Sequence, residues 1–362
     1  MQIHIIAFLL FLQSFVPWQQ GQENALPASA DLVYQSADSS RTDSSRLNQH
    51  RSAPADLVYQ SVDGGETWQN VSAGLPADMQ VQVFFATGSE IFLGYEEGLY
   101  HRNTSASPAW QHELLLHGRI TDVYPGRSGL FACSYGLGLF QNIFGTGIWK
   151  NMNNSLEDKS VRTVLETPDG TIFVGTDIGI YKSDDGSQTW KQVYADGLIL
   201  NIVASGEVLI AGGIQGVLRS TDGGEHWDTV LYEYILAKKT GLIGDRFVTI
   251  LGTNNPDKVS PKGLTDRLRV SVDGGKTWKR LERTLLPIKG IYEMDESLSQ
   301  IKDIYDIVQV GEYLFCSFDA GIFRSSDQGK TWKPVFPSNG KWSFQLAGSG
   351  KVIYAVKSGV GC

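Results

Sequence analysis

One short phrase, Ser-x-Asp-x-Gly-x-Thr-Trp, occurs in five near-complete copies and limits what this chain can fold into more than any other feature. Two further tryptophans, Trp110 and Trp149, stand between the first and second copies, so tryptophans recur about every 40 to 50 residues. Such a period indicates one supersecondary unit that is stacked many times. The repeated positions are Ser61, Asp63, Gly65, Thr67 and Trp68; Ser183, Asp185, Thr189 and Trp190; Ser220, Asp222, Gly224 and Trp227; Ser271, Asp273, Gly275, Thr277 and Trp278; and Ser325, Asp327, Gly329, Thr331 and Trp332.

The residue types of this phrase suit a tight turn between two strands. Asp and Ser side chains accept hydrogen bonds from the backbone N–H groups that follow them. The Gly positions tolerate the positive φ that a hairpin connection needs. We expect the Trp to begin the outgoing strand and to cover the edge of the sheet with its apolar ring. The phrase therefore predicts structural turns, and no catalytic or metal-binding role for its aspartates.

The sequence between the phrases repeats as well. Residues 171–183, 208–220 and 313–325 each contain an apolar strand, a bend that ends in Gly, and an alternating strand that runs into the phrase. A further strand and turn come before this pattern, as in residues 161–170. One unit therefore has four strands, A to D, with the phrase between C and D.

The phrase resembles the Asp box, or BNR repeat, of sialidases and related β-propellers. In that family the box joins the third and fourth strands of a blade, away from the active site. The resemblance covers residues 55–362, and the two degenerate units at Trp110 and Trp149 bring the count to seven blades. We number the blades by their tryptophans, from blade 1 at Trp68 to blade 7 at Trp332.

The two ends of the repeat complement each other. The repeat begins with a C strand at residues 56–61 and ends with an A and B pair at residues 342–347 and 352–356. We expect these terminal strands to form one blade and to close the ring, which removes open sheet edges. The prediction is an all-β, seven-bladed β-propeller with four antiparallel strands per blade.

Composition excludes several classes of function. The net charge is −8 at pH 7, so electrostatics give no support for nucleic-acid binding. Three cysteines are too few for a disulfide framework. No group of residues has metal-ligand or cofactor-binding spacing, so we expect no metal and no cofactor. We expect a monomer without a transmembrane segment.

The N-terminus has the pattern of a secretory signal. An apolar run at residues 3–16 is too short to span a bilayer, and Ala28-Ser29-Ala30 is a small-x-small cleavage pattern. Residues 1–30 are therefore predicted to be a signal peptide, and residues 31–54 a polar, disordered leader. The leader contains residues 31–36, an identical copy of residues 56–61. One hypothesis is that either copy can fill the same strand position.

Strand order also predicts where a ligand would bind. The D–A and B–C connections share one face, which we call the top face, and the A–B and C–D turns share the bottom face. The two longest connections, residues 253–267 and about 283–300, both fall on the top face, and loops on a rigid scaffold often carry binding sites. The candidate binding residues in these loops are Lys258, Lys262, Asp266, Arg267, Tyr292, Glu293, Met294 and Asp295, and those at the channel mouth are Arg119, Arg162, Asp303 and Asp306. Asp122, Asn201 and Lys341 are expected at the same mouth, in a solvated channel lining.

The resemblance implies several functions, which the residues separate. Sialidases of the family need an arginine triad and an Arg-Ile-Pro signature and have six blades, whereas this chain lacks the signature. Xyloglucan hydrolases of this repeat class use a cleft between two propellers, and sortilin-type propellers have ten blades. The single seven-bladed photosystem II assembly or stability factor type fits better. We therefore expect a secreted, non-catalytic propeller that binds a protein or glycan through its top face, with a glycoside hydrolase as the alternative.

Overall fold

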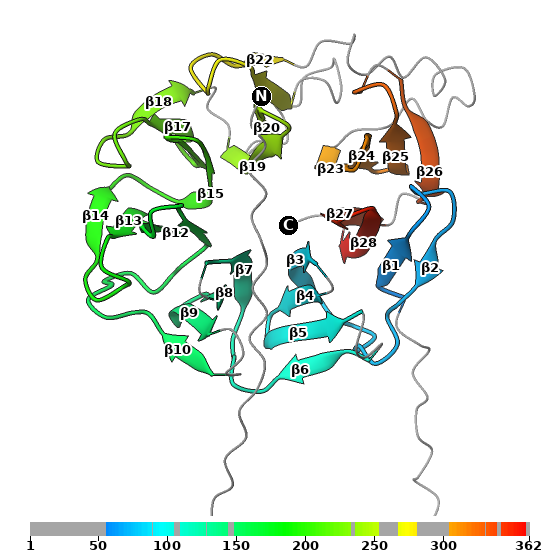
Figure 1. The fold of residues 1–362 in the computed structure, drawn as a ribbon, viewed down its shortest axis with the longest axis horizontal. Coiled ribbons are helices and arrows are strands. Elements are labelled where there is room, and N and C mark those ends of the chain that lie inside the picture. Colours follow the sequence, from blue (N-terminus) through cyan, green and yellow to red (C-terminus); the bar gives the residue numbers. More distant parts are fainter. Residues whose placement is uncertain are drawn as a thin grey trace, which may run out of the picture. The chain divides into compact units, whose positions relative to one another are not determined.

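The computed structural model describes residues 56–88, 90–104, 109–127, 129–143, 148–232, 236–252, 267–280, 304–329, 331–338 and 342–359. These residues form seven four-stranded antiparallel sheets arranged as a ring (Figure 1). Strand A of each sheet lies at the centre of the ring and strand D at its rim (Figure 1). The prediction of a seven-bladed β-propeller is confirmed.

The strands of each blade follow in the order A, B, C, D. Blade 1 is β27 (Trp342–Ser349), β28 (Val352–Gly359), β1 (Val58–Ser61) and β2 (Gln69–Asn70). Blade 2 is β3 (Val81–Thr87), β4 (Glu90–Tyr95), β5 (Gly98–Asn103) and β6 (Gln111–Glu113). Blade 3 is β7 (Ile120–Pro125), β8 (Gly129–Ser134), β9 (Gly138–Ile143) and β10 (Trp149–Asn151). Blade 4 is β11 (Thr163–Glu166), β12 (Ile172–Thr176), β13 (Gly179–Ser183) and β14 (Lys191–Tyr194).

The remaining three blades repeat this pattern. Blade 5 is β15 (Ile199–Ser205), β16 (Val208–Gly213), β17 (Gly216–Ser220) and β18 (Asp228–Leu231). Blade 6 is β19 (Leu236–Ile243), β20 (Arg246–Gly252), β21 (Leu268–Ser271) and β22 (Lys279–Arg280). Blade 7 is β23 (Ile304–Val310), β24 (Tyr313–Phe318), β25 (Gly321–Ser325) and β26 (Lys333–Pro337).

Blade 1 closes the ring as the sequence predicts. Strand β1 pairs antiparallel with β28, with Val58 opposite Val356 and Ser61 opposite Ile353. Both valines are fully buried. The closing blade is therefore assembled from the two ends of the described chain, and no four-stranded sheet is left incomplete.

The five Asp boxes form the C–D turns through one shared set of hydrogen bonds. In the first box, the amide of Gly65 donates to Ser61 Oγ at 2.8 Å, and Thr67 donates from its amide and its hydroxyl to Asp63 at 3.0 and 2.6 Å. The hydrogen bonds from Thr67, its hydroxyl foremost, hold the pKa of Asp63 well below its usual value. Gly64 and Gly65 both have positive φ, as the turn requires. The carboxylate of Asp63 is therefore occupied by hydrogen bonds within its own turn.

The tryptophans do more than cover sheet edges. In the five boxes each Trp directly precedes strand D instead of beginning it. The described residues form seven hydrophobic clusters between neighbouring blades, and each cluster contains one of the seven repeated tryptophans. The indole N–H of Trp278, for example, donates to the carbonyl of Gly275 in its own box at 3.1 Å. This bond ties the indole to its turn, and the ring packs against the hydrophobic cluster between blades 5 and 6.

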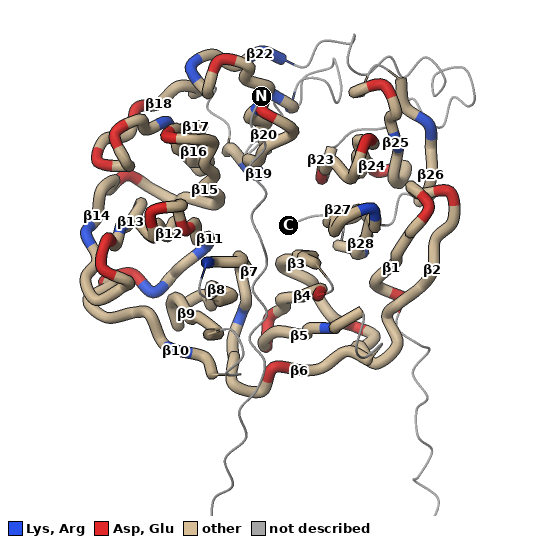
Figure 2. Tube along the Cα trace, viewed as in Figure 1, with Lys and Arg blue, Asp and Glu red and all other residues tan. Residues whose placement is uncertain are grey.

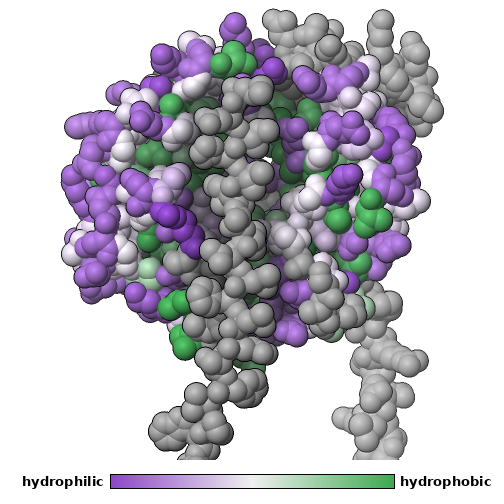
Figure 3. Space-filling view, viewed as in Figure 1, coloured by the Kyte–Doolittle hydropathy of each residue, from purple (hydrophilic) through white to green (hydrophobic). Residues whose placement is uncertain are grey.

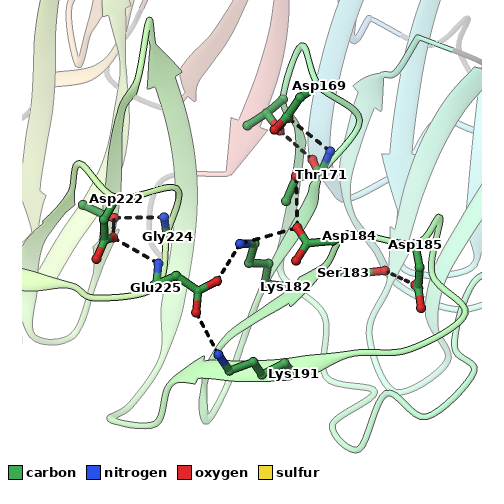
Figure 4. Close-up of polar contacts among 12 residues, drawn as sticks. Asp169, Thr171, Lys182, Ser183, Asp184, Asp185, Lys191, Asp222, Gly224 and Glu225 are labelled. Carbon is green, nitrogen blue, oxygen red and sulfur yellow. Dashed lines mark hydrogen bonds and ion pairs between the residues drawn. The ribbon is translucent and has the colours of Figure 1, made fainter.

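Polar contacts on the bottom face connect several pairs of neighbouring blades. Lys182 on β13 pairs with Glu225 in the following Asp box, with Nζ and Oε1 2.7 Å apart, and Lys191 binds the other carboxylate oxygen (Figure 4). The hydrogen bonds from Lys182 and Lys191 lower the pKa of Glu225 to about 2. At the closure, Arg324 of blade 7 reaches Glu66 of blade 1 in the same way at 2.7 Å. The same type of contact therefore recurs at the junction that closes the ring.

Candidate functional site

The top face is built from the connections that strand order places together. Because strands A to D alternate in direction, the start of A, the end of B, the start of C and the end of D lie at one end of every blade. Figure 2 shows acidic and basic residues on the connections around the ring. The B–C turns and D–A connections thus share one face, as expected from the sequence.

Three polar side chains on the innermost strands connect neighbouring blades. Asp306 on β23 accepts a hydrogen bond from the amide of Leu346 on β27 at 2.9 Å. Asp122 on β7 accepts from the amide of Val164 on β11 at 3.2 Å. Asn201 on β15 makes the equivalent bond to the amide of Thr240 on β19 at 2.9 Å. We call Asp122, Asn201 and Asp306 the inner bracket.

Asp306 differs from the solvated channel lining that the sequence suggested, whereas Asp122 and Asn201 are half-buried. Asp306 is only 2% exposed, and burial raises the pKa of Asp122 although hydrogen bonds from Thr163 and Val164 lower it. The cause is a register shift in strand A just before each of these residues. A bulge of this kind redirects the side chain, and here it turns the side chain toward the next blade. Asp306 is therefore engaged in contacts within the protein.

Lys239 on β19 adds a charge to this ring that sequence reasoning missed. Its Nζ lies 2.6 Å from Asp306 Oδ1, and the lysine side chain is 45% exposed. The charge of Lys239 also lowers the pKa of Asp122, which belongs to a different blade. A register shift precedes Lys239 just as it precedes Asp122 and Asp306. Lys239 occupies the same position in its strand A as Asn201 and Asp306, so an alignment of the repeats could have identified it.

Arg119 and Arg162, both candidates from the sequence, lie at the starts of strands A on the top face. Arg119 donates to Gln82 Oε1 at 2.8 Å and lies 3.5 Å from Glu96. Arg162 pairs with Asp177 at 2.7 Å, and its guanidinium lies 4.3 Å from the centre of the Tyr135 ring.

These contacts tie each arginine to a B–C turn. Burial alone would lower the pKa of Arg162, but the hydrogen bond from its guanidinium to Asp177 and the charge of Asp177 raise it. The pKa of Asp177 is correspondingly lowered. Arg162 and Asp177 are therefore a charged pair at neutral pH and not an acid–base pair.

A cluster around Trp342 is a further feature that the sequence did not single out. Trp342 begins β27 and is 44% exposed. Lys357 Nζ lies 5.9 Å from the Trp342 ring and 5.3 Å from the Tyr59 ring, and it pairs with Asp56 at 2.5 Å. The cross-strand partner of Trp342 is Gly359, which has no side chain to cover the indole.

Aliphatic side chains also stand out on the top face. Leu114 and Leu115 in the connection from blade 2 to blade 3 are 69% and 64% exposed. Three B–C turns carry one exposed aliphatic residue each, and the connection after blade 5 carries an exposed tyrosine. These residues are Leu137, Ile178, Ile214 and Tyr232. Sequence reasoning looked in the longest loops, whereas the signal here is exposed apolar residues in short connections.

The long top-face loops lie outside the described residues. Their candidate residues Lys258, Lys262, Asp266, Tyr292, Glu293, Met294 and Asp295 are therefore not placed, nor are Asp303 and Lys341. Arg267 is described: it lies just before β21, and its carbonyl accepts from the amide of Leu251 at 2.8 Å. The signal-peptide and leader predictions also fall outside the described residues.

Metal-ligand clusters and membrane-spanning helices are both absent from the residues that the structure describes. No group of three or more His, Cys, Asp or Glu side chains within these ranges is arranged to hold a metal ion. No helix in this part of the chain is long and apolar enough to cross a membrane.

The face in view in Figure 3 is mostly hydrophilic over the blades, with hydrophobic residues visible between them.

Comparisons with known proteins support the fold. No protein-family model matches the chain, and no curated protein matches its sequence. Among solved structures, YCF48 from Cyanidioschyzon merolae matches 78% of this chain and 97% of its own, with 15% identity and a TM-score of 0.53. An ancestral GH74 enzyme matches with 16% identity and a TM-score of 0.52, and the GH74 enzyme of Niastella koreensis with 12% and 0.50.

These likenesses establish architecture and nothing finer, because all the identities are low. The matches cover 78% and 70% of this chain but only 40% and 45% of the two GH74 chains. The chain therefore spans less than half the length of these enzymes, and nearly the whole length of YCF48. It is a seven-bladed β-propeller that resembles both groups in fold.

Proposed function

We propose that this propeller is a non-catalytic, secreted scaffold that holds a protein partner on its top face. One observation carries the proposal. Of the twelve large hydrophobic residues that are exposed in the described part of the chain, six lie on B–C turns or D–A connections and a seventh, Trp342, begins a strand A at the same face; the six are Leu114, Leu115, Leu137, Ile178, Ile214 and Tyr232. Exposed apolar groups gathered on one face of a folded domain are typical of protein interaction sites.

The polar groups of the same face support binding over catalysis. A glycosidase of the usual kind needs two carboxyl groups about 5 to 9.5 Å apart, of which the acid has a raised pKa. Of the described top-face carboxylates, Glu96 and Asp177 each face an arginine, at 3.5 and 2.7 Å, whereas Glu97 and Glu157 are exposed without an ion pair. The likeness to YCF48 in fold extends over nearly the whole length of that protein.

Blocking one face at a time tests this proposal. In a Cys362→Ser background, Ile178→Cys places a thiol on the top face and Val272→Cys places one on a bottom-face box turn, at 49% and 70% exposure. Each thiol is coupled to a polyethylene glycol maleimide, and the immobilised proteins are incubated with the extracellular fraction of the native host. The buried Cys133 and Cys316 stay unmodified.

We expect top-face modification to abolish capture of the partner and bottom-face modification to leave it intact. Capture that survives the top-face block but not the bottom-face block would overturn the proposal. A panel of chromogenic glycosides tests the enzyme alternative, and turnover above the blank would replace the scaffold by a glycoside hydrolase. A partner released by free sugar would identify a glycan in place of a protein.

A further inference from the structure

Three exposed leucines on the top face lie on two neighbouring connections, and we call them the leucine patch. Leu114 and Leu115 lie in the connection from β6 to β7, and Leu137 lies in the turn between β8 and β9. The connection and the turn are in contact, because a Cβ atom on Gly118 would lie 3.3 Å from Leu137 Cδ1. The side chains are 69%, 64% and 47% exposed.

The backbone beneath the patch is held in place by hydrogen bonds. Ser134 Oγ donates to the carbonyl of His117 at 2.9 Å, and the amide of Tyr135 donates to the carbonyl of Arg119 at 2.8 Å. Leu116, between the exposed leucines and His117, is 1% exposed and anchors the connection in the core. Because this surface is ordered before any partner binds, binding would cost it little conformational entropy.

The charges beside the patch are unbalanced. Three basic side chains of the neighbouring turns make contacts within the protein. Arg119 lies 3.5 Å from Glu96, and Arg162 pairs with Asp177 at 2.7 Å. Lys159 donates a hydrogen bond to the carbonyl of Asn153 at 3.2 Å. Lys159 keeps its positive charge, because a carbonyl is neutral, and two exposed carboxylates of the neighbouring turns have no ion pair among the described residues.

Glu97 and Glu157 are these two exposed carboxylates, and neither has an ion pair within the described ranges. Glu97 precedes Gly98, where a Cβ would lie 2.8 Å from the carbonyl of Leu116. Glu157 lies in the same loop as Lys159, whose carbonyl accepts a hydrogen bond from the amide of Gly136 at 3.0 Å. Each connection of the patch therefore lies next to a turn or loop that has an exposed carboxylate without an ion pair in the described part of the chain.

We propose that the leucine patch binds a segment of the partner protein that carries aliphatic side chains next to lysine or arginine. This inference rests on the proposed function and specifies the chemistry of its partner. Apolar contact supplies the affinity, and the carboxylates of Glu97 and Glu157 select a cationic segment over an anionic one.

The test uses two fluorescent peptides of equal length, one with a leucine face and a lysine face, the other with glutamate in place of every lysine. Binding to the full chain is measured by fluorescence anisotropy at low and at high salt. The first variant is Leu114→Ser/Leu115→Ser. Its matched control is Val62→Ser/Val272→Ser, which changes two side chains on bottom-face box turns at 61% and 70% exposure.

A second variant tests the charge. Glu97→Lys reverses one of the two carboxylates, and Glu207→Lys reverses an exposed carboxylate in the A–B turn of blade 5 on the bottom face. All four proteins are compared with wild type by circular dichroism and thermal melting, so that a loss of binding is not confused with a loss of folding.

We expect the lysine peptide to bind about tenfold or more tightly than the glutamate peptide, with a preference that shrinks at high salt. The leucine double variant should bind it about tenfold more weakly, and both bottom-face controls within about twofold of wild type. Equal binding of the two peptides, or unchanged binding by the leucine double variant, overturns the inference. Self-association of wild type that the double variant abolishes would also overturn it, in favour of a second copy as the occupant.

The face-blocking experiment separates the two proposals. If top-face modification abolishes capture while Leu114→Ser/Leu115→Ser retains it, this inference fails and the scaffold function stands. If top-face modification leaves capture intact, the scaffold function fails, and the peptide measurements still decide whether the patch prefers cationic segments.

Discussion

Removing the carboxylate of Asp306 should destabilise the whole ring although the residue lies at the channel mouth. Its Oδ1 accepts from the amide of Ile307 at 2.8 Å and pairs with Lys239 at 2.6 Å, while Oδ2 accepts from the amide of Leu346 on the next blade at 2.9 Å. Asp306→Ala leaves the buried amide of Leu346 without an acceptor and Lys239 without its counter-ion. Asp306→Asn keeps an acceptor in the same place.

The chain itself provides the reference for the asparagine variant. Asn201 occupies the equivalent position, accepts from the amide of Thr240 at 2.9 Å and donates to the carbonyl of Leu200 at 2.7 Å. Asp306→Asn can keep the bond to Leu346, but it loses the bond from the amide of Ile307 and the ion pair to Lys239, which is 45% exposed and can be hydrated. We therefore expect Asp306→Asn to cost about 1 to 2 kcal/mol, and Asp306→Ala about 3 to 5 kcal/mol because it breaks a buried, hydrogen-bonded charge pair.

Urea unfolding followed by tryptophan fluorescence measures both free energies. For a domain of this size about 1 kcal/mol corresponds to roughly 2 °C in melting temperature, so thermal melts give an independent check. A variant Asp306→Ala as stable as wild type would refute the inner bracket. If Asp306→Asn is as unstable as Asp306→Ala, the ion pair and not the hydrogen bond to Leu346 holds the blades together. A stable Asp306→Ala protein that fails to bind its partner would assign the residue to binding instead.

Four further perturbations give distinct results. Because burial raises the pKa of Asp122 in the folded state, its charge costs stability as the pH rises above the ordinary value of 3.8. The free energy of unfolding of wild type should therefore fall relative to that of Asp122→Asn as the pH rises from 3.8 toward neutral; parallel pH profiles would contradict this. The pKa of Asp185 is instead lowered to about 2, chiefly by the hydroxyl of Thr189, so its contribution is present above pH 3.8 and lost as the pH falls toward 2. Thr189→Val should therefore lower the melting temperature at pH 7 and approach wild type in acid, whereas an equal loss at both pH values would point to packing. Trp278→Ala should cost about 2 to 4 kcal/mol in urea unfolding, since it empties part of the cluster between blades 5 and 6; a loss below about 1 kcal/mol would remove the tryptophan from the core. Deleting residues 31–50 should leave the melting temperature unchanged if residues 56–61 alone fill the closing strand, and a decrease would implicate the first copy.

Much of the fold could be predicted from the sequence because the Asp box is a local structure. The bonds from Gly65 and Thr67 back to Ser61 and Asp63 span four residues, so they form wherever the phrase occurs. Residue types at fixed spacing therefore gave the turns, and counting the turns gave the blades. The pairing of β1 with β28 followed by elimination, since each of the two chain ends had half a blade.

The sequence by itself thus determined the repeat, the seven blades and the position of the closure, because these depend on contacts within one unit or on counting units. Only the tertiary structure decided what lies between the units. A bulge in strand A turns Asp306 toward Leu346, and Lys239 meets it from another blade, although 67 positions separate Lys239 and Asp306 in the chain. The leucine patch arises in the same way, since Leu115 and Leu137 come from turns of different strand pairs that the ring brings together. Contacts between blades depend on the twist and angle of whole sheets, which no local pattern of residues encodes.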